Sequence, residues 1–446
     1  MSNRREFIKN LGLVVAGASF VTLSSGFRKK GPNDLINIGI IGTGSHCMQR
    51  NLPHYLKYNE LCKVVAVCDV SMSRAASAKE LVDKTYKTSD CIIYQDFRQL
   101  LDNKSIDAVQ ITTPDHWHVP ISIMAALKGK HVCCEKPTLT IAEGRLLCDV
   151  IKKTGVTYQV SVEDRCEKIY HKMAEIVLNG RIGALKHIEI ASPMGWLPDN
   201  KKEMEETTPP PDLDFNLWLG PAPEIAYIPA RTFIGFRYYN AFSGGIVVDW
   251  GAHLCDTAQL VTGTDFSGPV EVTPAGDTVF HNDGVFNTAW QFDLNYKYAN
   301  NVTMRFTDTS KLPENQKIGP FPGANIRIEG EEGWIESIGW LAEIHASNNK
   351  ILDLNGKRVN LPTSADEILN FLESIKTGNK SIYSPEIGHR TSSLLHLGNI
   401  ALKLNRKVGW DPRLESFIND PEAEKLRKRQ MREPWSYAEI CPGYKY

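Results

Sequence analysis

Two short segments of the chain carry side chains that together could remove a proton and stabilise a negative charge. Lys136 lies in a Glu-Lys-Pro triplet, and Asp249 precedes His253 by four residues, behind two adjacent glycines. If the second segment is helical, Asp249 and His253 project from the same face. An imidazole has a pKa near neutrality and suits a general base, while an ammonium group stabilises an alkoxide. These residue types fit the deprotonation of a hydroxyl group.

A glycine-rich turn precedes these segments in the chain. Gly42-Thr43-Gly44 follows an apolar run, and a helix is expected from about Met48, so that backbone amides can hold a pyrophosphate. Asp69, at the end of the next apolar run, suits the ribose hydroxyls of NAD and would repel the 2′-phosphate of NADP. Arg74 keeps NADP as the less favoured alternative, and a purely structural glycine turn is the alternative to both. Cys47 departs from the usual third glycine of this fingerprint.

The pattern around the glycine turn predicts a parallel sheet. Short runs rich in Ile and Val alternate with segments of helical spacing. Such units form a doubly wound α/β (Rossmann) domain, whose ligands lie beyond the carboxyl ends of the strands. The predicted strands are Ile36–Ile41, Val64–Val67, Ala108–Ile111, His131–Cys134 and Thr157–Val160, and the predicted helices are Ala75–Val82, Ile121–Leu127 and Ile141–Ile151.

The second half of the chain has a different texture, with longer alternating segments separated by turn residues. A helix is expected near Met173–Leu178, a mostly antiparallel sheet after it, helices again over 365–406, and an irregular, charged tail at the end. The predicted strands of this sheet include Lys186–Ile190, Asn287–Phe292, Asn301–Phe306 and Ala324–Ile328. We therefore predict a signal segment at 1–30, a dinucleotide-binding domain at 34–160 and a substrate-binding α+β domain at 161–446.

The N-terminal residues resemble an export signal. Arg4-Arg5 precedes Phe7-Ile8-Lys9, and an uncharged run rich in Gly, Ala and Ser follows from Leu11 to about Ser25. This arrangement is similar to a twin-arginine signal and predicts a periplasmic protein that is folded around its cofactor before export. The run is short for a membrane span, so the mature chain is expected to have none. An uncleaved anchor or a plain tail is the alternative.

Composition narrows the class of partner. A chain of 446 residues is expected to form two domains, and its net charge of −1 offers no field that attracts nucleic acid or an anionic membrane. A small-molecule partner is therefore expected. The ten cysteines include no CxxC and no Cys/His metal spacing, so we predict no metal site. Most of the cysteines are expected to be buried free thiols, although one disulfide is possible.

Several motifs together resemble one enzyme family. Thr113-Pro114-Asp115-His116-Trp117-His118, Glu135-Lys136-Pro137, Gly244–His253 and Gly388-His389-Arg390 join the glycine turn. Over nearly the whole chain after the signal, they resemble the glucose–fructose oxidoreductase/inositol dehydrogenase (Gfo/Idh/MocA) family of nicotinamide enzymes. The resemblance implies a Rossmann domain followed by a large, open-faced antiparallel sheet, which commonly provides a homo-oligomer interface in this family.

The resemblance also implies site residues. The catalytic set is Lys136, Asp249 and His253, with His253 the preferred base, Lys136 polarising the reacting oxygen and Asp249 orienting substrate or base; Lys136 and His253 could exchange roles. The cofactor set is Gly42, Thr43, Gly44, Ser45, His46, Asp69, Arg74, Thr113, Pro114, His118, Glu135 and Lys136. The weaker substrate candidates are Glu163, Arg165, Arg237 and Tyr238. For Glu163 and Arg165 the alternative is a salt bridge between the two domains, and for Tyr238 it is packing in the core. A cis peptide bond before Pro137 is a further hypothesis.

The expected activity is the reversible oxidation of a secondary hydroxyl on a sugar or glycoside by tightly held NAD. The main alternative is a glycosidase or lyase that oxidises C3 transiently, eliminates the aglycone and returns the hydride. The relatives known for that cleavage lack Glu-Lys-Pro at the matching place, whereas this chain keeps it. The third hypothesis is a sugar sensor without catalytic activity, which the presence of Lys136, Asp249 and His253 disfavours.

Overall fold

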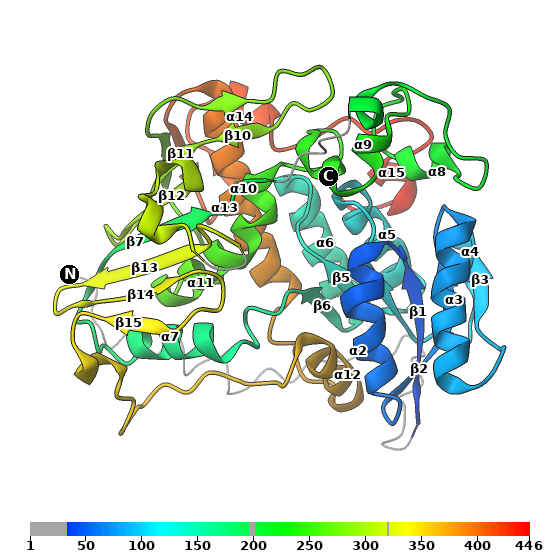
Figure 1. Ribbon diagram of the computed structural model, residues 1–446, viewed down its shortest axis with the longest axis horizontal. Coiled ribbons are helices and arrows are strands. Elements are labelled where there is room, and N and C mark those ends of the chain that lie inside the picture. Colours follow the sequence, from blue (N-terminus) through cyan, green and yellow to red (C-terminus); the bar gives the residue numbers. More distant parts are fainter. Residues whose placement is uncertain (1–33, 196–200, 319–320) are drawn as a thin grey trace.

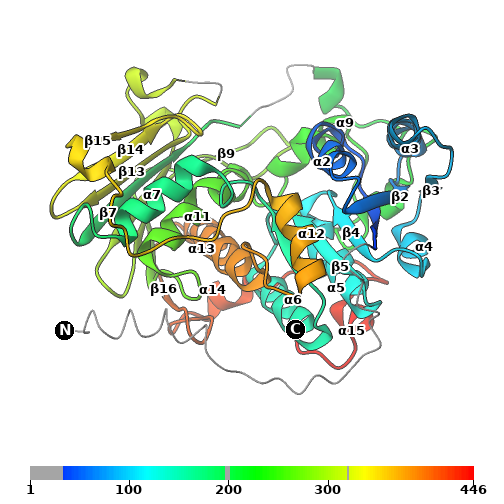
Figure 2. The same cartoon turned by 90° about the horizontal axis from the view of Figure 1, so that it is seen from below.

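The structure is a computed structural model that describes residues 34–195, 201–318 and 321–446 (Figure 1). The predicted export signal lies outside these residues. Within the described ranges, no helix is both long and apolar enough to cross a membrane. Two sheets lie side by side in the molecule, one built from the first third of the chain and the other from the remainder (Figures 1 and 2).

The first sheet has six parallel strands in the order β3-β2-β1-β4-β5-β6, which confirms the predicted doubly wound domain. Its central strands are largely buried, as their Ile and Val content requires, whereas the edge strand Ile92–Tyr94 is partly exposed. The strands are β1 (Ile36–Ile41), β2 (Cys62–Cys68), β3 (Ile92–Tyr94), β4 (Ala108–Ile111), β5 (His131–Glu135) and β6 (Tyr158–Ser161). The helical segments are η1 (Cys47–Asn51), α2 (Leu52–Lys57), α3 (Met72–Tyr86), α4 (Phe97–Asp102), α5 (Asp115–Leu127) and α6 (Ile141–Thr154).

The second sheet has nine strands in the order β15-β14-β13-β7-β12-β11-β8-β16-β17. Only the central pair β7–β12 is parallel, so the prediction of a mostly antiparallel sheet is confirmed. The strands are β7 (Leu185–Ser192), β8 (Glu271–Pro274), β11 (Asp293–Lys297), β12 (Thr303–Asp308), β13 (Asn325–Gly330), β14 (Trp334–Ile338), β15 (Ile344–Ala346), β16 (Val408–Asp411) and β17 (Ser416–Phe417).

Helices α7 (Lys168–Leu178), α11 (Gly251–Thr262) and α13 (Pro385–Leu404) pack against this sheet and form the larger core with it. Helix α13 lies between the two sheets, against α6 on one side and β8 on the other (Figures 1 and 2). The remaining elements are η2 (Lys201–Met204), α8 (Phe215–Leu219), α9 (Pro229–Thr232), η3 (Ile234–Tyr238), α10 (Ile246–Asp249), β9 (Val279–Phe280), β10 (Ala289–Gln291), η4 (Thr309–Lys311), η5 (Glu314–Gln316), η6 (Asn349–Leu352), α12 (Glu367–Thr377), α14 (Pro421–Lys425) and α15 (Tyr437–Ile440).

The end of the chain corrects the prediction of an irregular tail. Residues after 420 form α14 and α15 and return to the Rossmann domain, where Tyr437 is 3% exposed. Its hydroxyl donates a hydrogen bond to Glu143 of α6, and the ring of Trp435 meets the ring of Trp117 edge to face at 4.8 Å. Aromatic burial against α5 and α6, together with two short helices, therefore orders part of the segment that was predicted to be irregular.

All ten cysteines are free and nine of them are buried, which confirms the expectation of buried thiols. Burial raises the pKa of thiols such as Cys47 and Cys62 to about 12, so they behave as small apolar side chains.

Candidate active site

One pocket at the carboxyl ends of the parallel strands collects most of the predicted site residues. Segments from the second half of the chain, between residues 217 and 253 and at 321 and 340, complete its walls. The predicted residues that line it are Gly42, Gly44, Ser45, His46, Asp69, Arg74, Thr113, Pro114, His118, Glu135, Lys136, Glu163, Arg237, Asp249 and His253. Thr43, Arg165 and Tyr238 do not line it.

The glycine turn has the geometry that close approach of a ligand requires. Gly42 adopts a φ of +86°, and a Cβ there would lie 2.5 Å from the carbonyl oxygen of Thr112. A Cβ at Gly44 would meet no atom within 4 Å, so this side of the turn is open. The Thr43 amide donates a hydrogen bond to the Asp69 carboxylate at 2.7 Å, so Thr43 holds this carboxylate in place. The turn and Asp69 therefore fit a dinucleotide.

Lys136 and Asp249 form a partly buried ion pair that lines the pocket. The ammonium group lies 2.6 Å from the Asp249 carboxylate and also donates to the Asp249 carbonyl at 3.0 Å. The guanidinium of Arg237 lies 3.1 Å from the same carboxylate. Burial alone would raise the pKa of Asp249, but Lys136 and Arg237 hold it well below its ordinary value. Asp249 is therefore an anion that fixes two cations beside the space for a substrate.

His253 pairs with a carboxylate that the sequence reading did not identify. Its Nδ1 lies 2.6 Å from Asp164, which directly follows β6, so Asp164 and not Asp249 orients the imidazole. Burial lowers the pKa of His253, but the attraction of Asp164 outweighs this effect and leaves the pKa above its ordinary value. Of the two roles predicted for Asp249, orientation of the base therefore falls to Asp164, whereas Asp249 pairs with Lys136 and Arg237. Asp164 lies between Glu163 and Arg165, two residues that were already site candidates, and this position was the signal in the sequence that could have identified it.

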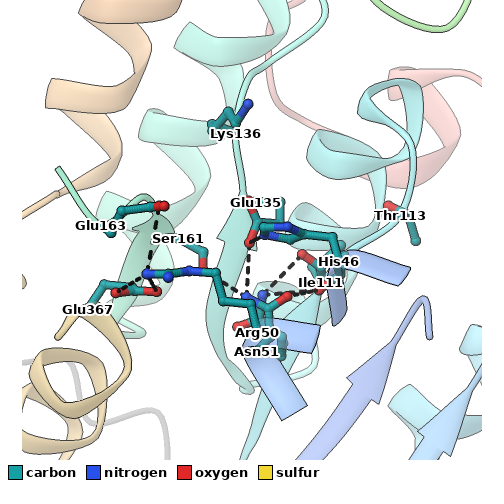
Figure 3. A network of polar contacts seen from close by, with 12 residues as sticks. His46, Arg50, Asn51, Ile111, Thr113, Glu135, Lys136, Ser161, Glu163 and Glu367 are labelled. Carbon is teal, nitrogen blue, oxygen red and sulfur yellow. Dashed lines mark hydrogen bonds and ion pairs between the residues drawn. The ribbon is translucent and has the colours of Figure 1, made fainter. Parts of the chain in front are cut away.

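A polar network below the pocket fixes Glu163 and Glu135 (Figure 3). Arg50 donates to both oxygens of Glu367 on α12, at 3.0 and 3.2 Å, and lies 3.8 Å from Glu163. Glu135 accepts hydrogen bonds from His46 at 3.1 Å and from Asn51 at 2.9 Å. Burial raises the pKa of Glu135, but His46, Asn51 and the nearby Lys136 hold it at about 2. The helical segment after the glycine turn is thus tied to the end of β5, directly before Lys136.

His118 ties two loops of the pocket together. Its Nδ1 lies 2.8 Å from the carbonyl of Pro137 and its Nε2 lies 2.7 Å from the carbonyl of Thr113. Both ring nitrogens are therefore engaged within the protein, so the imidazole serves to position its neighbours. The Lys136–Pro137 peptide bond is cis, as hypothesised.

Two of the weaker substrate candidates are structural. Arg165 is buried and binds Asp256 at 2.5 Å and Asp265 at 2.7 Å, a salt bridge within the second domain and not the one expected between the domains. Tyr238 is 2% exposed and packs its ring edge to face against Phe286. Because the Arg165 guanidinium already binds two carboxylates, it has no N–H group left for a sugar hydroxyl. Tyr238 is packed in the core and does not reach the pocket. Trp196, a further aromatic candidate for stacking on a sugar, lies outside the described residues.

Comparison with known proteins places this site in context. The chain is 25% identical to D-glucoside 3-dehydrogenase of Escherichia coli over 281 residues, which cover 61% of this chain and 74% of that protein. It is 24% identical to myo-inositol 2-dehydrogenase of Thermotoga maritima over 391 residues, or 84% and 98% of the two chains. Matches to an uncharacterised oxidoreductase of Rhizobium meliloti (34%) and an alpha-N-acetylgalactosaminidase of Shewanella oneidensis (25%) each span only 45% of the relative.

Solved structures share the fold. The WlbA dehydrogenase of Chromobacterium violaceum, solved with NADH and UDP-GlcNAcA, superposes with a TM-score of 0.64 at 17% identity, covering 84% of this chain and 96% of that one. The oxidoreductase family with an NAD-binding Rossmann fold matches residues 36–162, and the C-terminal alpha/beta domain of the same family matches residues 171–437. The chain therefore belongs to the Gfo/Idh/MocA oxidoreductase family, and its first domain is an NAD-binding Rossmann domain.

Proposed function

We propose that this protein oxidises a secondary hydroxyl group of a sugar or glycoside, using NAD that it retains between turnovers. One observation carries the proposal: a lysine–carboxylate pair and a histidine–carboxylate pair open into the same pocket as the glycine turn and Asp69. The first pair supplies positive charge and the second supplies a base, and both are needed when a hydroxyl is converted to a carbonyl.

The protein's own groups divide the reaction as follows. Bound NAD supplies the hydride acceptor. His253 faces Asp164 through Nδ1, which leaves Nε2 to take the hydroxyl proton from the substrate. Lys136 stabilises the developing alkoxide, and Asp249 holds the ammonium group in place. Glu163, fixed by Arg50, is positioned to accept a hydrogen bond from a neighbouring hydroxyl.

A polyhydroxylated ring is the substrate class that these groups fit. Lys136, Arg237, Glu163 and His253 offer charged donors and acceptors on one side of the pocket, as a sugar with several hydroxyls requires. The relatives named as D-glucoside 3-dehydrogenase and myo-inositol 2-dehydrogenase both act, by their names, on secondary hydroxyls of such rings. These two similarities support a sugar or glycoside here.

Two features support NAD over NADP and a slow release of the cofactor. The Asp69 carboxylate would repel a 2′-phosphate. Next to it, Asp212 from the second half of the chain accepts hydrogen bonds from Ser71 at 2.8 Å and Ser73 at 2.7 Å. The ring of Phe233, in the same half, lies against Arg74 at 6.0 Å. Residues 212–233 therefore lie across the ribose end of the site and would slow dissociation.

Export and assembly remain part of the proposal. The twin-arginine-like segment supports a periplasmic location, where a retained cofactor would be needed because no free dinucleotide pool is expected. The large antiparallel sheet supports a homo-oligomer. Mass spectrometry of protein from the export compartment checks signal removal, and light scattering checks the oligomeric state; an unprocessed cytoplasmic monomer would contradict both.

A glycosidase that uses NAD transiently is the second candidate. Oxidation followed by elimination needs one base for the hydroxyl and another for the acidified C–H, and the pocket holds two separate acid–base pairs. The similarity to an alpha-N-acetylgalactosaminidase also supports it. Product analysis separates the two candidates, because net cleavage without net cofactor reduction favours the glycosidase.

The proposed dehydrogenase is tested on the purified protein. We expect denaturation of the protein to release NAD, which mass spectrometry detects. Adding sugars or glycosides to the native protein should produce the absorbance of reduced nicotinamide without added cofactor. A Lys136→Met variant should keep NAD but lose the absorbance change. Protein without dinucleotide that also fails to reduce added NAD with any sugar or glycoside tested would refute the proposal.

A further inference from the structure

Three aromatic side chains form a wall of the pocket that the chemistry above does not use. Trp250 comes from the junction of α10 and α11, Phe321 from the turn before β13, and Trp340 from the turn after β14. Their ring centroids lie 4.9 Å (Trp250–Phe321), 5.4 Å (Phe321–Trp340) and 6.0 Å (Trp250–Trp340) apart, with interplanar angles of 57°, 78° and 89°. We name this cluster the aromatic corner.

The aromatic corner begins at the proposed base and extends to solvent. The ring of His253 lies 5.5 Å from Trp250 and 6.1 Å from Trp340, whereas Phe321 is 40% exposed. A substrate whose reacting hydroxyl meets His253 would therefore pass its substituent along these rings toward the pocket mouth. Exposed aromatic surface that adjoins a polar site is typical of a ligand-binding region.

The chemistry of the corner selects the substituent. Phe321 has no polar atom, and the indole N–H of Trp340 points to Asp164 at 3.4 Å. These two rings therefore offer no hydrogen-bond partner to the hydroxyls of a second sugar, whose burial would be costly. An aromatic group loses no hydrogen bond there and packs well in the edge-to-face or offset geometry that steeply angled rings provide.

We infer that the aromatic corner binds an aromatic aglycone, so that the preferred substrate is an aryl glycoside rather than a free sugar or an oligosaccharide. This inference rests on the proposed function for the identity of the reaction, but binding at the corner can be measured without turnover.

The test compares matched glycosides by calorimetry on the protein loaded with reduced cofactor (NADH), which cannot oxidise them. The probes are phenyl and methyl β-glucosides, phenyl and methyl β-galactosides, and the disaccharides cellobiose and lactose. We expect the phenyl glycoside to bind about tenfold more tightly than its methyl partner. Phe321→Ala and Trp340→Leu should each remove most of this preference, and Phe321→Ala leaves the Asp164–His253 pair untouched. Trp334→Leu is the control, because the Trp334 ring packs on Arg327 at 4.1 Å, outside the pocket.

Specific outcomes would overturn the inference. Equal binding of phenyl and methyl partners, tighter binding of a disaccharide, or no binding of either phenyl glycoside would each do so. A preference that survives both corner variants would also contradict it. Cofactor reduction, recorded in parallel, separates the two proposals: tight phenyl-glycoside binding without any reduction refutes the dehydrogenase and leaves the corner in place, whereas reduction with no phenyl preference refutes the corner alone.

Discussion

Replacing Asp164 by Asn should move the pH dependence of the enzyme in a defined direction. His253 must be neutral to accept a proton, so kcat/KM rises with pH through the pKa of His253 in the free enzyme. Burial lowers this pKa and Asp164 more than compensates, so the rising limb of the native enzyme should lie above the ordinary value of 6.5. In Asp164→Asn the attraction of the carboxylate is lost, while burial and Lys136 still disfavour the imidazolium. The His253 pKa, and with it the rising limb of the pH profile, should therefore fall below 6.5.

The size of the shift follows from the contact. An opposite charge in direct contact typically changes a pKa by about 1–3 units, and the Asp164–His253 distance of 2.6 Å places this pair at close range. The plateau rate should also drop, by about 10²-fold, since a weaker and less firmly oriented base remains. The shift applies only to the limb at lower pH.

The assay is a pH profile of kcat/KM with the glycoside that reduces the cofactor fastest, supported by NMR titration of the His253 ring in the resting protein. The Glu163→Gln variant is the matched control, because Glu163 also raises the His253 pKa, but less than Asp164, which contacts the imidazole directly. Its limb should move in the same direction by a smaller amount. A limb that stays in place in Asp164→Asn, or an equal shift in both variants, would refute the assignment of Asp164 as the partner of the base.

Three further predictions concern the cofactor and stability. Gly42→Ala should abolish NAD retention, measured by mass spectrometry, because the new Cβ would lie 2.5 Å from the Thr112 carbonyl oxygen and displace the glycine turn. Retained NAD would contradict the role of this turn in holding the cofactor. Arg145→Leu should lower the free energy of unfolding by about 1 kcal/mol in denaturant titrations, because Glu415 loses its 2.7 Å partner while Arg390 and His389 stay at 2.8 and 2.9 Å; an unchanged midpoint would count against this. Burial raises the pKa of Glu367 to about 7 from 4.5, so the folded state holds a proton that the unfolded state releases. Stability should therefore fall by roughly 3 kcal/mol as pH rises through this window, and the fall should vanish in Glu367→Gln.

The sequence by itself was sufficient for features that depend on local pattern. Strands β1 and β4 begin and end at the predicted residues, because runs of Ile and Val flanked by turn residues report a buried strand directly. The glycine turn was recognised in the same way, from a short motif between a strand and a helix, whereas Lys136, Asp249 and His253 were selected because their motifs together resemble one enzyme family. The three-residue edge strand β3 was missed, since so short a segment carries no periodicity.

The tertiary structure decided which charges meet. His253 pairs with Asp164, 89 residues away, although Asp249 is four residues away, and Arg50 pairs with Glu367 across 317 residues. The aromatic corner likewise joins turns from three separate segments. The chain contains 52 acidic side chains of similar chemistry, so residue type alone cannot select a partner. The packing of the two domains selects it, because packing decides which carboxylate reaches a given cation in a buried site. At His253 the attraction of Asp164 outweighs the cost of desolvation, whereas at Glu367 burial outweighs the attraction of Arg50.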